Sequence, residues 1–172
     1  INNNFNHLIF AAKDYAEFFF THATSNKSYS IIPHGIKKKV NLNKINYENK
    51  INFIFTGGNA FNKGWHIVEE SFEYLLKKYP NTIKLRVYGD KKKTLKSKIN
   101  IFKNVEFFEN FDHNDLNKIL KWADVGLVPS YFDTYNLILR EFINNQVIPI
   151  TSNFFSVSDI ITNNQNGIIL KE

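Results

Sequence analysis

From Ile51 to the end of the chain, short apolar runs alternate with polar or amphipathic segments about six times. The apolar runs are INFIF, LRVYG, VEFF, ADVGLV, VIPIT and NGIIL. Strands that are apolar throughout are typical of sheets covered on both faces, and helical crossovers join such strands in parallel. With right-handed crossovers, the pattern predicts an α/β fold, a Rossmann-like doubly wound parallel sheet of about six strands.

The segments between these runs predict the helices. Apolar residues from Ile67 to Tyr79 repeat at helical spacing, and Pro80 ends that pattern. Helices are expected over 64–79, 112–122, 134–144 and 157–162, with a weakly helical basic stretch over 91–100. Before the sheet, His7 to Phe20 is apolar and aromatic and is expected to be helical. A short strand is expected at 29–32, and a polar connector over 41–50.

Composition limits the class of protein. The 172 residues suit one domain. The sequence has no cysteine for disulfides or thiolate metal sites, and it has no run of about 18 apolar residues that could span a membrane. The chain starts with Ile1 and contains no methionine, so a fragment of a larger protein is expected. No secretory leader is recognised, which makes the cytoplasm the default location.

The net charge is +6, and much of it lies in the lysine runs 37–39 and 91–93. Solvated loops explain such runs, and so does attraction to an anionic substrate or to the inner membrane surface. Nucleic acid is not expected as a partner, because arginine is scarce and no helix combines clustered arginine with base-reading side chains.

Parallel sheets bind ligands at the carboxyl ends of their strands, so the loop GGNAFNKG is a candidate site. Gly57 and Gly58 allow the backbone to approach a ligand closely, and Lys63 supplies a charge for phosphate. The loop lacks the Gly-Lys-Ser/Thr ending of a Walker motif. The alternative is a flexible turn with an exposed lysine.

The segment PSYFDTYNLILRE is the second candidate. Asp133 lies in a loop after a buried strand, and Glu141 follows eight residues later on the expected helix. A helix start favours anions, and carboxylates accept bonds from sugar hydroxyls. Alternatively, Asp133 or Thr134 only caps the helix and Glu141 is solvated, although Glu141 lies off the apolar stripe. The five histidines show no zinc-ligand spacing, so no metal site is expected.

Four segments together resemble the nucleotide-sugar-binding, C-terminal half of a GT-B glycosyltransferase, closest to glycosyltransferase family 4. IIPHGI resembles I-P-N-G-V, and FIFTGGNAFNKG resembles F-V-G-R-L-x-x-x-K-G. WADVGLVPSYFDTYNLILREF resembles A-D-V-x-V-x-P-S-x-x-E-x-F-G-L-x-x-x-E-A. SNFFSVSDIITNNQNGIIL resembles S-x-x-G-x-x-E-I-I-x-x-G-x-N-G-x-L. The four motifs occur in the family's order.

The resemblance implies a role for each matching position. Asp133 and Glu141 would be the catalytic pair, contacting the transferred sugar and the ribose of the nucleotide. Gly57, Gly58 and Lys63 would form the diphosphate loop. The start of the helix would present backbone N–H groups to the donor, at Thr134, Tyr135, Asn136 and Leu137. The loop after VEFF would lie against the base.

The implied reaction moves a sugar from a UDP- or GDP-sugar to an acceptor hydroxyl, with retention and without metal or cofactor, in polysaccharide or glycoconjugate synthesis. Residues 31–172 would be the donor domain, and 1–30 the tail of a missing N-terminal domain plus a linker. That missing domain would bind a saccharide or lipid-linked acceptor, with peripheral membrane contact. The fragment alone is expected to be inactive.

Several positions depart from the family pattern. Gly58 replaces an arginine, Asp133 a glutamate, Asn136 and Gln146 glycines, and Asp159 a glutamate. Two other functions therefore remain: a non-catalytic GT-B relative that acts as a scaffold, and a GT-B sugar-nucleotide epimerase. Restoring arginine at Gly58 would distinguish the enzyme from the scaffold.

Overall fold

The computed structural model describes residues 6–22, 28–35, 50–58, 60–90, 96–112 and 114–171. Its main part is a six-stranded sheet in the order β5-β4-β3-β6-β7-β8, with every neighbouring pair parallel. The α/β fold with a parallel sheet is therefore confirmed. Its strands are β3 (Ile51–Phe55), β4 (Ile83–Tyr88), β5 (Val105–Phe108), β6 (Val125–Val128), β7 (Ile148–Thr151) and β8 (Ile168–Ile169).

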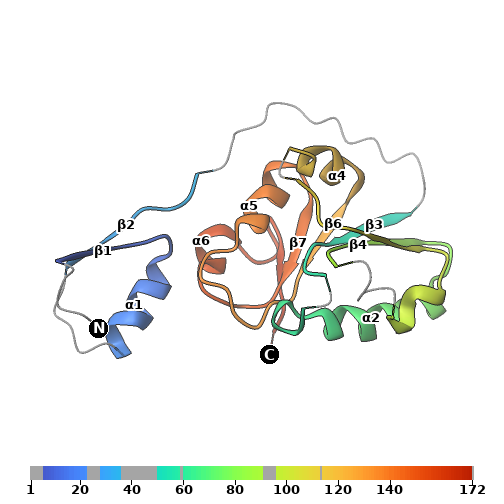
Figure 1. The fold of residues 1–172 in the computed structure, drawn as a ribbon, viewed down its shortest axis with the longest axis horizontal. Helices are drawn as coiled ribbons and strands as arrows, with labels where there is room; N and C mark the ends of the chain where they lie inside the picture. The colour runs from blue at the N-terminus through green and yellow to red at the C-terminus, as the bar shows by residue number, and fades with distance from the viewer. Residues whose placement is uncertain are drawn as a thin grey trace.

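Helices cover both faces of this sheet. Figure 1 shows α2 on one face and α4 and α5 on the other. The helical segments are η1 (Phe61–Lys63), α2 (Trp65–Lys78), η2 (Lys98–Ile101), α4 (Leu116–Trp122), α5 (Leu137–Asn144) and α6 (Val157–Ile160). Because side chains alternate along a strand, Ile54 packs toward α4 and α5 while Phe55 packs toward α2. This is the doubly wound arrangement.

The strand order reverses at one point. The chain moves outward from β3 through β4 to β5, and then returns to the other side of β3 and continues from β6 through β7 to β8. The crevice beside the carboxyl ends of β3 and β6 is therefore the topological switch point, where open α/β sheets bind ligands. The loops that follow these two strands are the two candidate loops of the sequence.

The first part of the chain differs from the prediction. His7 to Phe20 is not one helix: β1 (His7–Phe10) pairs in parallel with β2 (Ser28–Ile31), and α1 (Lys13–His22) joins them. A short apolar run such as HLIF fits a strand as well as a helix. Its pairing with β2 makes it a strand. The strand expected at 29–32 is confirmed one residue earlier.

This N-terminal βαβ unit is tied to the sheet domain. Both carboxylate oxygens of Asp14 accept from the backbone N–H of Ser156, at 3.0 and 2.8 Å. Phe155 packs against Tyr15 and Phe18 of α1, with ring centroids 5.2 Å apart in each pair. β2 ends at Ile31, the residue at which the donor domain is predicted to begin.

Other expected elements are shifted or lie outside the described residues. The predicted helix 112–122 begins at Leu116, and α6 ends at Ile160. The end of the basic stretch 91–100 belongs to η2. Residues 91–95 lie outside the described residues, as do the connector 41–49 and the lysine run 37–39. Within the described ranges, no helix has both the length and the apolar character needed to cross a membrane.

Candidate donor site at the switch point

A cavity of about 300 Å³ lies at the carboxyl ends of β3 and β6. Six of the nine predicted site residues line it: Gly57, Lys63, Asp133, Tyr135, Asn136 and Leu137. Its other walls are Phe55, Thr56, Leu127, Val128, Ser130 and Ile138. Gly58, Thr134 and Glu141 are outside this lining. Two loops separated by about seventy residues in sequence therefore form one site.

The main electrostatic feature of the cavity is an ion pair between its two loops. Lys63 Nζ lies 2.7 Å from Asp133 Oδ2. The lysine side chain is 38% exposed and the carboxylate 17% exposed, so water still reaches the pair. A half-buried cation and a carboxylate from the two loops can each take a part of a sugar diphosphate, with phosphate toward Lys63 and hydroxyls toward Asp133.

Asp133 also shapes its own loop. Its Oδ1 accepts from the backbone N–H of Tyr135 at 3.3 Å, as in an Asx turn, and Asn136 Nδ2 donates to its Oδ2 at 3.1 Å. An aspartate side chain is short enough to bond the backbone two residues on. Asp133 therefore holds its own loop in shape as well as pairing with Lys63.

The helix start was predicted wrongly. α5 begins at Leu137, not Thr134, and its cap is Asn136, whose Oδ1 accepts from Ile138 N at 3.1 Å. Asn136 has φ −82, so this position does not need the glycine of the family pattern. Asp133 and Thr134 do not cap the helix, which excludes that alternative for Asp133.

Replacing Asn136 with alanine is expected to lower the free energy of unfolding by about 1 kcal/mol, through loss of the helix cap. The same change also removes a donor to Asp133. Urea unfolding followed by tryptophan fluorescence measures this effect. Thr134→Ala is the control, since exposed Thr134 is not the cap, and equal losses in both variants would contradict the assignment of Asn136.

Gly64 brings the two loops into contact. It is the C-cap of η1 and the N-cap of α2, with φ +79, and a Cβ at this position would overlap the carbonyl oxygen of Pro129. Next to it, Tyr131 N donates to the carbonyl of Asn62 at 3.0 Å. These backbone contacts place Lys63 within reach of Asp133.

Gly58 has a different backbone constraint. It lies at φ +60, and a Cβ there would come 3.2 Å from the Cα of Gly89 on the neighbouring strand end. The family's arginine at this position would therefore meet strain from both φ and crowding. Gly58→Arg would change backbone strain and charge at the same time. A substitution of Lys63 is therefore the better test of the site.

Glu141 is buried on α5, with 9% of its surface exposed. It is therefore not the solvated helix residue of the alternative interpretation. Beside it on the chain, the Arg140 guanidinium lies 5.1 Å from the Tyr135 ring centroid. The Tyr135 hydroxyl donates to the carbonyl of His34 at 3.4 Å, and the two rings meet edge to face. His34 thus reaches the cavity wall through Tyr135, and contact of Glu141 with ribose stays a prediction.

Sequence reasoning missed Ser130. Its side chain is 2% exposed and lines the cavity, and its Oγ has no hydrogen-bond partner within the described protein. A buried hydroxyl without a partner carries a free-energy cost that a ligand atom can remove. Its position two residues after the strand ADVGLV was the only signal, and this edge of the sheet has too many loop residues for position alone to identify Ser130.

The loop expected against the base follows β5 at Glu109. Phe108 stacks on Tyr88 with centroids 4.8 Å apart, and Phe111 meets Tyr88 edge-on at 5.5 Å. Burial raises the pKa of the Tyr88 hydroxyl above its ordinary value, against the opposing influence of Arg86. None of these side chains is in the lining of the described cavity, and the base contact stays a prediction.

Gln146 shows the same backbone demand that glycine meets in the family pattern. It follows the end of α5 with φ +58, the left-handed conformation that commonly ends a helix. A residue with a Cβ costs about 1–2 kcal/mol in this conformation. The end of α5 therefore has a conformation that glycine adopts without this cost.

Comparison with known proteins gives a family and a fold. The model of the family described as glycosyl transferases group 1 matches residues 37–172. A search of curated proteins finds no significant match.

Among solved structures, a mutant of S. aureus TarM in complex with Fondaparinux, alpha-GlcNAc-glycerol and UDP has a TM-score of 0.83 and 16% identity, over 98% of this chain and 34% of that one. The pneumococcal O-GlcNAc transferase GtfA in complex with UDP and GlcNAc has a TM-score of 0.80 and 16% identity, over 97% and 34%. WaaG, a glycosyltransferase involved in lipopolysaccharide biosynthesis, has a TM-score of 0.75 and 20% identity, over 95% and 48%. The chain thus spans one third to one half of these proteins.

Proposed function

Because this chain belongs to the glycosyl transferases group 1 family, we propose that it is the donor-binding part of a larger GT-B glycosyltransferase. The cavity at the switch point supports this most strongly, since the loop after β3 supplies Lys63 and the loop after β6 supplies Asp133. A nucleotide sugar needs a cation for its diphosphate and an acceptor of hydroxyl hydrogen bonds for its sugar. Residues 31–172 are proposed as the donor domain.

Donor binding exchanges partners within this site. The diphosphate takes the bond that Lys63 now gives Asp133, and a sugar hydroxyl donates to the carboxylate that Lys63 releases. The start of α5 adds backbone N–H groups near Asn136 and Leu137, where the helix dipole favours an anion. Each charged group keeps a partner, which lowers the cost of breaking the ion pair.

In the proposed reaction, the bond between the anomeric carbon and the diphosphate oxygen breaks, and its electron pair leaves with the nucleoside diphosphate. The acceptor hydroxyl oxygen forms the new glycosidic bond, and its proton passes to the departing diphosphate. Lys63 stabilises the charge that develops on that leaving group. This scheme is retaining and uses neither metal nor cofactor.

The proposed donor is a UDP- or GDP-sugar. The TarM and GtfA complexes contain UDP, which favours the uridine nucleotide. The acceptor is a saccharide or a lipid-linked saccharide, as in polysaccharide or glycoconjugate synthesis at the cytoplasmic face of a membrane, and the rest of the enzyme helps to bind it.

Titration of the chain with UDP and with GDP, followed by amide NMR shifts, tests this proposal. Millimolar nucleotide is expected to shift the resonances of Gly57, Lys63, Asn136 and Glu141, and the stronger binder identifies the base. If neither nucleotide shifts the amides near Lys63 and Glu141, the donor site is refuted.

A non-catalytic relative that acts as a scaffold is the second candidate. It is favoured by the pairing of Lys63 with Asp133, which satisfies both charges without ligand. It is also favoured by Gly58, which supplies no second cation and stands where a side chain would be strained. The scaffold predicts that nucleotide leaves the spectrum unchanged, so the same titration separates the two functions.

A further inference from the structure

A second cavity of about 390 Å³ lies where the N-terminal βαβ unit meets the loops after β6 and β7. Its lining consists of Asp14, Tyr131, Phe132, Asn153, Phe154 and Phe155. None of these residues lines the donor cavity. The volume is within the range of about 300–1,000 Å³ that is common for small-molecule sites.

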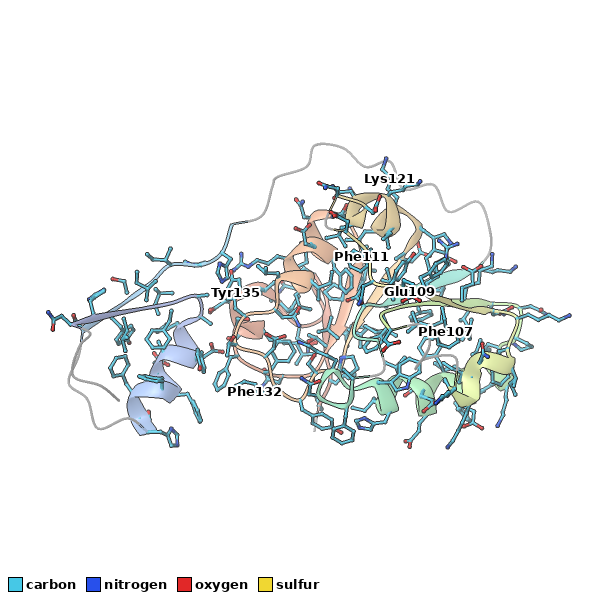
Figure 2. All side chains as sticks on the ribbon, viewed as in Figure 1. Phe107, Glu109, Phe111, Lys121, Phe132 and Tyr135 are labelled. Atoms are coloured by element: carbon cyan, nitrogen blue, oxygen red, sulfur yellow. The ribbon has the colours of Figure 1, made fainter. Side chains whose placement is uncertain are left out.

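The loop after β6 forms the wall between the two cavities. Ser130 and Asp133 line the donor cavity, whereas Tyr131 and Phe132, which lie between them, line the second cavity. Figure 2 shows Phe132 on the side of the sheet domain that faces α1. A molecule in the second cavity would therefore be separated from the proposed sugar position only by this short loop.

Tyr131 is an exposed ring held in a defined orientation. It is 57% exposed, yet its ring stacks on Phe61 and on His66 with interplanar angles of 15° and 5°. Its hydroxyl is 2.6 Å from Nε2 of His66. Such fixing lowers the entropy cost of using the ring as a binding surface.

Phe132 continues this aromatic surface toward the N-terminal unit. It is 53% exposed and meets Phe155 edge-on at 5.7 Å, and Phe155 in turn packs on Tyr15 and Phe18. Two large aromatic side chains are therefore open to solvent beside a cavity, where a ligand with an apolar face can cover them.

Polar groups complete the lining. The Asp14 carboxylate is oriented by three backbone bonds, from Ser156 N to both oxygens and from Tyr15 N at 2.8 Å, and two oxygens can accept about four in all. Asn153 is exposed, and its amide can both donate and accept. The cavity thus combines fixed aromatic faces with a carboxylate and an amide.

We propose that this cavity binds a sugar ring of the saccharide acceptor. A pyranose has apolar C–H faces, which suit Tyr131 and Phe132, and a rim of hydroxyls, which suits Asp14 and Asn153. This inference rests on the proposed glycosyltransferase function, and it assigns part of the acceptor site to this chain rather than only to a preceding domain.

Titration with methyl glycosides of glucose, galactose and N-acetylglucosamine tests the proposal, again by amide shifts of the chain. At high millimolar concentration, at least one glycoside is expected to shift Tyr131, Phe132, Asn153 and Phe155. Phe132→Ala is expected to weaken that binding about tenfold. Tyr131→Phe keeps the stacked ring and removes only the hydroxyl contact with His66, so it is expected to weaken binding less than Phe132→Ala does.

Tyr74→Ala is the matched control, because Tyr74 is an exposed aromatic residue on α2, outside this lining. Absence of shifts with all three glycosides, or equal weakening by Phe132→Ala and Tyr74→Ala, would overturn the inference. A UDP titration of the same samples separates the two proposals. Shifts with UDP and none with glycosides remove the acceptor site alone, whereas shifts with glycosides and none with UDP remove the donor site alone.

Discussion

Replacing Gly64 with alanine is expected to lower the free energy of unfolding by about 3 kcal/mol or more. Two costs combine. At φ +79 a residue with a Cβ costs about 1–2 kcal/mol, and the added methyl group would overlap the backbone of Pro129, which cannot rotate away as a side chain can. The loops carrying Lys63 and Asp133 must then move apart.

Urea unfolding measures the loss, and Trp65 and Trp122 supply the fluorescence signal. Gly35→Ala is the matched control: no atom lies within 4 Å of its added Cβ, so its stability should change by less than about 0.5 kcal/mol. If the two alanine variants were equally stable, the contact between Gly64 and Pro129 would be wrong.

Replacing Lys63 with methionine is expected to weaken nucleotide binding about tenfold to a hundredfold, because a hydrogen bond to a charged group contributes about 1.5–3 kcal/mol. Methionine keeps much of the apolar stem while removing the charge. Calorimetric titration with UDP and GDP measures the affinity. The same change leaves the partly buried Asp133 without its cation, so the stability of the variant must be measured beside its affinity.

Lys121→Met is the control for this substitution. Lys121 is exposed on α4, and Figure 2 shows it well away from Phe132 and Tyr135. Lys121→Met removes one positive charge, as Lys63→Met does, so any general electrostatic attraction of the basic chain for nucleotide falls equally in both variants. Equal affinities of the two variants would mean that Lys63 does not contact the diphosphate.

Local pattern was sufficient for most of the sheet domain. Apolar runs such as INFIF and ADVGLV form β3 and β6. A strand covered on both faces is apolar along its length, so it can be predicted without knowing its neighbours in the sheet. Where the signal was local but ambiguous, the prediction was wrong. HLIF was expected in a helix and forms β1, since its pairing with β2 depends on residues about twenty positions away.

The site shows the same division. Lys63 and Asp133 could be predicted as neighbours, because both follow strands that end at one edge of a parallel sheet. The cap at Asn136 could not, since Asp133, Thr134 and Asn136 all suit a helix start and only the path of the loop chooses among them. Ser130 was missed for a similar reason: nothing in its type or spacing shows that its hydroxyl is buried without a partner.

The sequence by itself therefore determined the fold class, the edge of the sheet where the candidate cavity lies and the loop that begins at PSYFD. These features follow from the alternation of apolar and polar segments along the chain and from the direction of the strands. Only the tertiary structure decided how the loops meet. The close approach of Gly64 to Pro129, the ion pair of Lys63 with Asp133 and the separation of two cavities by Tyr131 and Phe132 are contacts between distant segments, and backbone packing in three dimensions sets them.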